Sequence, residues 1–304
     1  MSVAKKGSKS RLAQELGVSR SSLYYKRKMP EKDEALRREI EAVMEDNPGY
    51  GSPRVALALG INEKRAYRVM RKFGLKPARR SKRPRKKGDE GLEPQKYPNI
   101  LGTLSPIAPD VVWVSDFTFI SYRGDFIYLC TVMDVFTGEI LGFNISRSHD
   151  ALFVKRAIER AIEYAGCLPT WFHSDQGSEY ASQRVRLWLE NARVQISMNP
   201  KASPWCNGSQ ESFFGRFKTE FGDPDRFDSF GELLEGMYEQ IAYFTCRRIK
   251  TKLKMAPAQF REQWLAEYKK FSTNINKDQQ LMSLPPDPPP DATRRLYPLL
   301  LFEE

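Results

Sequence analysis

Three carboxylates stand out in this sequence because of the residues that surround them. Asp116 lies in the apolar stretch VWVSDFTF, Asp175 follows the apolar run TWFH, and Glu211 lies in NGSQESFFGRFK, with 35 residues between the last two. An unpaired carboxylate among buried residues is costly, whereas converging carboxylate oxygens suit a hard cation such as Mg²⁺. We therefore expect Asp116, Asp175 and Glu211 to form one magnesium site. Each of them alone would equally fit a helix cap, a surface residue or an ion pair.

The segments that carry these carboxylates are typical of a mixed α/β domain. β-branched and aromatic runs predict three strands, the first two joined by Arg123-Gly124 as a tight hairpin turn. Helical patterns then alternate with two short apolar strands, and Asp150 and Gly166 are expected to begin and end the first helix. The predicted strands are 111–122, 125–137, 139–146, 170–173 and 194–197, and the helices are 150–166, 178–192 and 205–221. This order predicts a five-stranded mixed sheet covered by helices.

Within that sheet the three carboxylates have different positions. Asp116 falls in the middle of a strand, Asp175 at the carboxyl end of a strand, where α/β proteins place ligand sites, and Glu211 in a helix. His173 is expected to pack beside Asp175 rather than bind metal, because an imidazole suits magnesium poorly. Near the face of Glu211 on its helix, Asn207, Arg216 and Lys218 are candidates for holding phosphates. A solvated surface position is the alternative for Lys218.

The net charge of +11 is unevenly distributed along the chain. Residues 1–99 hold 26 Lys and Arg against 12 Asp and Glu, and residues 100–304 hold 23 against 26. A basic front half joined to a nearly neutral rear half indicates a module that binds a polyanion.

A repeated pattern in the front half indicates what that module is. Residues 11–28 and 54–72 both read as a helix, a glycine (Gly17, Gly60), a polar helix cap (Ser19, Asn62) and a second helix. This pattern is typical of a helix-turn-helix, which serves DNA binding or, less often, protein contacts. We expect a first such module at 1–30 and a second helical one at 31–75. The residues expected to face DNA are Arg20, Ser21, Lys64, Arg65 and Arg68.

The remaining segments differ in composition from both halves. Residues 76–104 form a predicted linker, since eight of the thirteen residues 76–88 are Lys or Arg, and Arg79, Arg80 and Arg83 are expected to follow DNA phosphates. A nuclear-import signal is the alternative for such a run, but nothing else in the chain favours it. A helical extension is expected at 223–270, and a proline-rich tail at 271–304.

Composition excludes several classes of protein. No apolar run approaches the roughly 20 residues that a membrane span needs, and the basic N-terminus lacks the apolar segment of a secretory signal. The four cysteines are scattered, which argues against a zinc site and a disulfide framework and fits a cytoplasmic protein.

The motifs resemble those of a known family. VWVSDFTFI, HSDQGSEYAS and NGSQESFFGRFKTE look like the three signature blocks of the retroviral-integrase-type DDE core, including its D,D(35)E spacing. Together with NPGYGSPRV and YFTCRRIKTKLKMAPAQF, they make residues 34 to 265 resemble the OrfB-type transposase of the IS-three family of insertion sequences. The chain departs from the family near 245–249, where Asn and Arg-Pro-His are common, so no role is transferred there. The leucine zipper that the family encodes in an upstream frame is also absent from this sequence.

The resemblance implies a fold, an activity and partners. It implies a ribonuclease H-like α/β core at 105–222, in which two Mg²⁺ ions (or Mn²⁺) are held by Asp116, Asp175 and Glu211, with Asp116 bridging both. The implied enzyme is a bacterial cytoplasmic transposase that binds the terminal inverted repeats, nicks DNA and transfers the 3′-hydroxyl to target DNA. It would act as a dimer or higher oligomer on DNA, alone or with an upstream-frame partner. The alternatives are a ribonuclease H-like nuclease without joining activity, and a DNA-binding regulator derived from a transposase.

Overall fold

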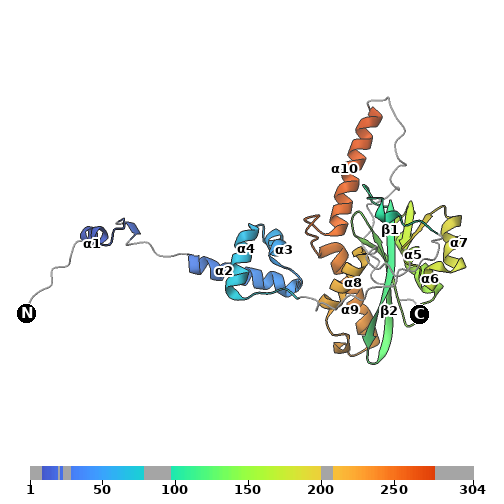
Figure 1. The fold of residues 1–304 in the computed structure, drawn as a ribbon, viewed down its shortest axis with the longest axis horizontal. Helices are drawn as coiled ribbons and strands as arrows, with labels where there is room; N and C mark the ends of the chain where they lie inside the picture. Colours follow the sequence, from blue (N-terminus) through green and yellow to red (C-terminus); the bar gives the residue numbers. More distant parts are fainter. Residues whose placement is uncertain (1–8, 20, 23–28, 79–96, 200–207, 278–304) are drawn as a thin grey trace, which may run out of the picture.

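The computed structural model describes residues 9–19, 21–22, 29–78, 97–199 and 208–277. Helices make up the N-terminal part of these residues, and a sheet with helices on both faces makes up the rest (Figure 1). The N-terminal helices are α1 (Lys9–Glu15), α2 (Met29–Asp46), α3 (Ser52–Leu59) and α4 (Glu63–Phe73). Arg20, Arg79, Arg80, Arg83 and Asn207, which are predicted DNA-binding residues, lie outside the described residues, as does most of the proline-rich tail.

The sheet has five strands in the order β3-β2-β1-β4-β5. Strands β1 (Val112–Tyr122), β2 (Asp125–Asp134) and β3 (Ile140–Ser146) pair antiparallel, and β4 (Trp171–Ser174) and β5 (Gln195–Met198) continue the sheet in parallel with β1. The predicted five-stranded mixed sheet is therefore confirmed. Arg123 and Gly124 both have positive φ, 49° and 92°, as a two-residue hairpin turn with the twist of the strands requires.

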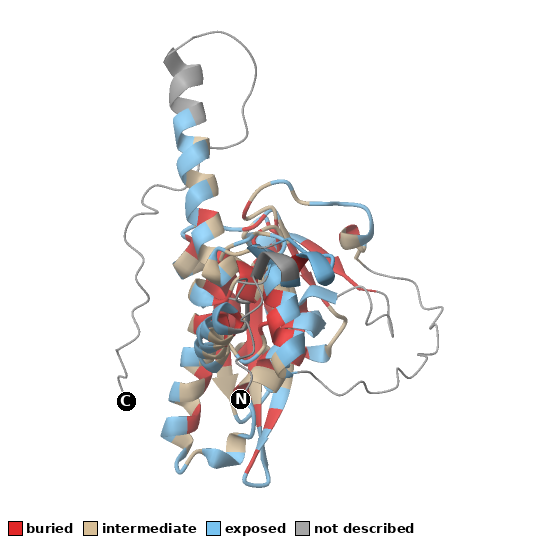
Figure 2. Cartoon of the chain, turned by 90° about the vertical axis from the view of Figure 1, so that its left-hand side faces the viewer, coloured by how far each residue is buried: buried red, intermediate tan, exposed pale blue. Residues whose placement is uncertain are grey.

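Each face of the sheet carries its own apolar core (Figure 2). Helices α5 (Ala151–Ala165), α6 (Ser178–Ala181) and α7 (Gln183–Asn191) cover one face, around residues such as Phe153 and Phe172. Helices α8 (Gly208–Phe221) and α9 (Phe230–Ala242) cover the other, around Phe217 and Met237. The face that a helix covers matters for function, because α8 carries Glu211.

The caps predicted for the first of these helices are present. The Asp150 side chain accepts a hydrogen bond from Phe153 N at 2.8 Å, and Gly166 ends α5 with φ 67°. The single helix predicted at 178–192 is wrong, because the chain breaks at Ser182, where ψ is 142°. There the Ser182 hydroxyl accepts from Val185 N and begins α7, since a serine side chain competes with the helical backbone for such hydrogen bonds.

Helices α2 to α4 form a separate small core. Leu36, Ile40, Val55 and Val69 are among its buried residues. Gly60 ends α3 with φ 62°, and the Asn62 side chain caps α4 by accepting from Lys64 N at 2.9 Å. The predicted helix, glycine turn and capped helix are thus present in the second module. In the first module, Gly17 has φ 63° after α1.

This helical module packs against the domain that contains the five-stranded sheet. The Tyr50 hydroxyl accepts from Ile249 N at 2.7 Å, Arg54 Nε donates to Ile249 O at 2.8 Å, and the Tyr243 hydroxyl donates to Asn47 Oδ1 at 2.9 Å. No pattern in the sequence predicts these contacts, because they join residues nearly 200 positions apart.

The C-terminal part continues the layer of α8 and α9. A π-helical turn at Tyr243–Arg247 follows α9, and α10 (Pro257–Lys277) extends beyond position 270, where the sequence predicted the start of the tail. Arg261 of α10 binds Asp110 at 2.5 Å and so ties this helix to the residues before β1. Within the described part of the chain, no helix is both long and apolar enough to cross a membrane.

Candidate active site

Asp116 lies in the middle of β1, opposite Thr131 of β2. Its Oδ1 accepts a hydrogen bond from the backbone N–H of Phe117 at 2.8 Å. Burial raises the pKa of Asp116 to about 7, and the negative charges of Asp175 and Glu211 act in the same direction. The three carboxylates predicted from the sequence therefore lie close enough to repel one another.

Asp175 directly follows β4, at the carboxyl end of the strand that lies next to β1. Its Oδ1 accepts from Gly177 N at 2.9 Å, which fixes the start of the loop. Burial raises the pKa of Asp175, and nearby Glu179 adds to this effect. A bound cation would lower the pKa of Asp116 and that of Asp175, because an opposite charge favours the ionised form of a carboxyl group.

Glu211 lies in the first turn of α8 and is exposed, whereas its neighbour Gln210 is fully buried. Gln210 Nε2 donates to Val114 O at 3.0 Å, and its Oε1 accepts from Thr131 Oγ1 at 3.0 Å. These bonds attach the first turn of α8 to β1, which carries Asp116, and to β2 beside it. The sequence prediction missed Gln210; the signal for it was an uncharged polar residue next to the candidate ligand, on a helix whose other buried side chains are phenylalanines.

The donor set of the site fits a hard divalent cation. Its side chains supply carboxylate oxygens, and a cation would offset both the burial of the Asp116 charge and its repulsion by Asp175 and Glu211. With the side chains as they stand, no three His, Cys, Asp or Glu residues of the described ranges lie close enough together to hold one ion. Asp116 and Asp175 are half-buried, and Glu211 is exposed.

Replacing Gln210 with Leu tests whether Gln210 positions Glu211, because the change leaves all three carboxylates in place. The change leaves Val114 O and Thr131 Oγ1 without their partner, and we expect a loss of about 1–3 kcal/mol in the free energy of unfolding. The activity of the site should fall by about 10- to 100-fold, because a displaced reacting group slows chemistry strongly. Ser209→Ala, an exposed neighbour in the same turn, is the control. Full activity in a folded Gln210→Leu protein would contradict this role.

His173 supports the loop that carries Asp175. Its ring is fully buried, with Nδ1 2.7 Å from Ser197 Oγ and Nε2 2.9 Å from Asn199 Oδ1. The carbonyl of Asn199 in turn accepts from Gln176 Nε2 at 2.9 Å. Both ring nitrogens thus have partners in β5 and the residue that follows it, and packing of His173 beside Asp175 stays a prediction.

The stability of the protein should depend on pH through His173. Burial lowers the pKa of His173 from 6.5 to about 4, so the unfolded chain takes up a proton before the folded one does. Its neutral ring thus stabilises the fold fully above pH 6.5, and this contribution is lost as the pH falls from 6.5 towards 4. Urea unfolding between pH 6.5 and 4 should show a smaller loss in the free energy of unfolding for His173→Gln than for the wild type. The glutamine keeps a hydrogen-bond donor for Asn199. Parallel pH profiles for the two proteins would contradict the assignment.

The structure also places the other predicted DNA-binding residues. Lys64 and Arg65 are exposed in the first turn of α4, and Ser21 is exposed after α1. Arg68 instead turns towards α2, where its Nη1 and Nη2 bind both oxygens of Asp33 at 2.8 and 2.6 Å. That ion pair lowers the pKa of Asp33 and holds α4 against α2. Arg68 therefore has a structural partner that the sequence prediction did not include.

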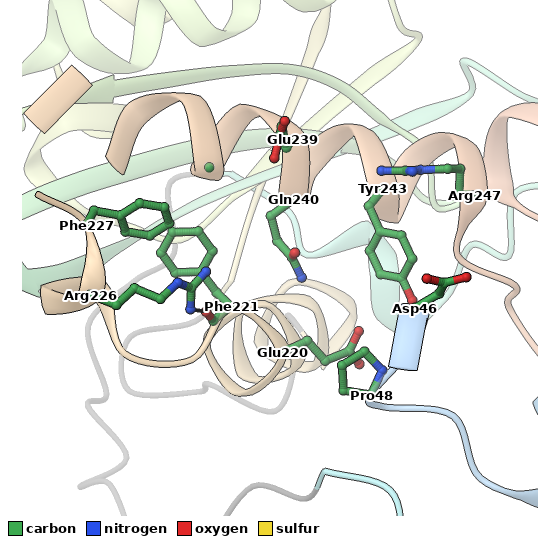
Figure 3. A pocket seen from close by; sticks show the side chains of 11 residues that line it. Asp46, Pro48, Glu220, Phe221, Arg226, Phe227, Glu239, Gln240, Tyr243 and Arg247 are labelled. Carbon is green, nitrogen blue, oxygen red and sulfur yellow. Dashed lines mark hydrogen bonds between the residues drawn. The ribbon is translucent and has the colours of Figure 1, made fainter. Parts of the chain in front are cut away.

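The remaining two lie on the helix of Glu211. Lys218 Nζ stands 4.9 Å from the centre of the exposed Phe119 ring of β1, and Arg216 is exposed two residues before it. Lys218 is thus on the side of α8 that faces β1, whereas residues two apart on a helix do not share a face, so Arg216 points to another side of α8. A cavity of about 230 Å³ lies further along, between the end of α2 and α9 (Figure 3). There the Glu220 carboxylate lies beside Pro48.

Comparison with known families agrees with the two-part architecture. The Integrase core domain family matches residues 106–204, and a second Integrase core domain family matches residues 211–265. The family described as Bacterial regulatory protein, Fis family, matches residues 4–29. Together with the five-stranded mixed sheet, these matches confirm the predicted integrase-type α/β core and the helix-turn-helix before it.

Individual proteins similar to the chain come from bacterial insertion sequences. The chain is 32% identical to InsK of Escherichia coli (strain K12), named as a transposase for IS150, over 81% of this chain and 90% of that protein. It is 29% identical to the transposase for IS904 of Lactococcus lactis, over 72% and 90%. Among solved structures, the magnesium complex of the HTLV-2 integrase catalytic core domain is 15% identical, with a TM-score of 0.43 over 52% of this chain and 99% of that chain.

Proposed function

Because this chain belongs to the transposases of insertion sequences, which carry an integrase core domain, we propose that Asp116, Asp175 and Glu211 are its catalytic residues. The enzyme is of the polynucleotidyl transferase type, and the reaction we propose is nicking at an element end followed by transfer of the freed 3′-hydroxyl to target DNA. The observation that carries this proposal is that Asp175 and Glu211 lie near enough to Asp116 for their charges to add to the effect of burial, which raises the pKa of Asp116 to about 7.

Asp116, Asp175 and Glu211 would hold the Mg²⁺ ions, of which we propose two. When bound, the metal supplies positive charge that activates the attacking hydroxyl and stabilises the leaving oxygen. The chain itself orients the site, since Gln210 fixes the helix of Glu211 on β1 and β2, and the Gly177 N–H fixes Asp175. No covalent intermediate with a side chain is needed, so no nucleophilic residue is required.

DNA binding is the second part of the proposal. The helix-turn-helix modules would recognise the terminal inverted repeats, with Lys64 and Arg65 exposed towards DNA on α4. Lys218 and Arg216 would hold phosphates next to Glu211. Like other enzymes that join two DNA ends, the chain would act as a dimer or higher oligomer on the DNA of the bacterial nucleoid.

Joining of a labelled DNA end to plasmid DNA tests the proposal. The substrate is a duplex that carries the sequence flanking the gene and ends in a recessed 3′-hydroxyl, incubated with the full chain and Mg²⁺. A covalent product between label and plasmid supports a transposase. Cleavage without joining would favour a nuclease, and binding without either reaction would favour a regulator with an inactive core.

A further inference from the structure

A cleft beside Glu211 holds more positive charge than its own carboxylates neutralise. It has a volume of about 260 Å³ and lies between the helical module and α8. Three arginines line it, Arg54 of α3, Arg216 of α8 and Arg248, together with Glu211 and Glu220. Its size is below that of clefts for drug-sized ligands, and it suits a small, strongly hydrated group.

Among the described residues, one of the three arginines forms an ion pair. Arg248 binds Glu220 through two hydrogen bonds of 2.9 and 2.5 Å, and both side chains are almost fully buried. Arg54 donates through Nε to a backbone carbonyl, and within the described ranges no carboxylate forms an ion pair with Arg54 or Arg216. Arg54 and Arg216 therefore line the cleft with no ion-pair partner in the part of the chain that the structure describes.

The positions of Arg54 and Arg216 make this arrangement costly for the protein alone. Partial burial lowers the pKa of Arg54, and the charges of Arg248 and Arg216 lower it further. Partial burial and Arg248 lower the pKa of Arg216 as well. Like charges gathered in a partly dry cleft repel one another, so the cleft favours an anion that accepts several hydrogen bonds. A phosphate group matches the planar fork of arginine in this way.

The cleft also connects the parts of the chain that are proposed to meet DNA. Residues 211, 212, 215, 216 and 219 of α8 all line the cleft, so an anion held by Arg216 lies about one and a half helical turns along α8 from Glu211. Ala78, at the other wall, donates its N–H to Pro48 O at 2.8 Å. The Lys- and Arg-rich segment of the sequence begins at the next residue.

We propose that this cleft binds one phosphodiester group of the DNA strand that enters the carboxylate site, held jointly by Arg54 and Arg216. The inference rests on the proposed function, and it assigns to Arg54 a role that its position in the helical module does not suggest. Because Arg54 belongs to α3 and Arg216 to α8, one phosphate would bridge the module and the catalytic helix. Binding of the DNA end would thus reinforce the contact between the two parts.

Salt dependence of DNA binding tests the proposal. Fluorescence anisotropy of a labelled duplex carrying the sequence that flanks the gene is measured with the full chain in EDTA, over a range of NaCl concentrations. We expect Arg54→Gln and Arg216→Gln each to weaken binding by roughly tenfold, as for loss of a charged hydrogen bond. Both side chains hold the same phosphate, so the double variant should lose one phosphate contact. The negative slope of log K against log[NaCl] should therefore become less steep by about 0.9.

Controls separate the phosphate contact from a structural role. Arg156→Gln removes an exposed charge on α5, which covers the opposite face of the sheet, and it should keep the wild-type slope. Arg54→Lys and Arg216→Lys keep the charge and should keep the slope. A double Gln variant that is folded and retains the wild-type slope would overturn the proposal, as would an Arg54→Lys protein whose slope falls as far as that of the double Gln variant. The assay contains no metal, so it stands apart from joining: a protein with this slope change but no joining would contradict only the proposed function.

Discussion

Asp116→Asn, Asp175→Asn and Glu211→Gln should each lower strand joining by several orders of magnitude while DNA binding remains near wild type. Each change keeps the shape of the side chain but removes a negative charge that would hold Mg²⁺. The measurement is joining of a labelled 3′-hydroxyl end to plasmid DNA, beside a binding assay with the same duplex. Substantial joining by Glu211→Gln would show that Glu211 is not the third ligand.

A thermal melt of the same variants gives a second readout that does not depend on activity. In metal-free protein the pKa of Asp116 rises from 3.8 to about 7 on folding. The folded state therefore holds the Asp116 proton up to a higher pH than the unfolded state does. Stability is therefore lost as the pH rises from about 4 to 7. Asp116→Asn lacks this loss and should melt above the wild type at pH 8 but not near pH 4. Mg²⁺ should raise the melting temperature of the wild type more than that of the variant.

The choice of metal should separate binding from chemistry in these assays. Mn²⁺ should replace Mg²⁺ in joining, whereas Ca²⁺ should support binding of DNA but little joining. The reason is that Ca²⁺ accepts a larger and looser coordination shell, which would misplace the reacting oxygens.

Arg248→Met should cost about 3–5 kcal/mol in the free energy of unfolding, because it leaves the buried Glu220 carboxylate without its partner. The side chains of Arg248 and Glu220 are only 3% and 4% exposed, and Gly49 of the helical module packs directly against Glu220. Loss of this pair should therefore also loosen the contact of the module with α8. Urea unfolding of the full chain measures the effect.

Two further variants identify the cause of that loss. Removing both charges, as Glu220→Leu with Arg248→Met, should recover most of the stability, since the cost comes from one unpaired buried charge. Arg37→Met breaks the exposed pair with Glu41, whose side chains are 39% and 40% exposed, and should cost less than about 1 kcal/mol. An Arg248→Met protein no less stable than Arg37→Met would show that the buried pair does not hold the interface.

The sequence by itself determined the order of elements and the positions of the three carboxylates along it. Alternating apolar runs specified β1 and β2 and their turn at Arg123-Gly124, and Asp150 and Gly166 marked the ends of α5. These features are local: a turn, a cap or a periodic pattern depends on residues a few positions apart. The motif blocks around Asp116, Asp175 and Glu211 indicated the family for a similar reason, since spacing along the chain is visible without coordinates.

Only the tertiary structure decided which side chains support the site and how the two parts of the chain meet. In the sequence, Gln210 resembles any polar helix residue. In the structure, α8 packs on β1 and β2, and the Gln210 amide forms hydrogen bonds with Val114 and Thr131. The sequence predicts that Arg68 contacts DNA, whereas the structure shows that Arg68 binds Asp33 of α2. The cleft of Arg54 and Arg216 needs α3 and α8 side by side. Hydrogen bonds and charge interactions fall off over a few ångströms in space, whatever the separation in sequence, so local patterns cannot specify them.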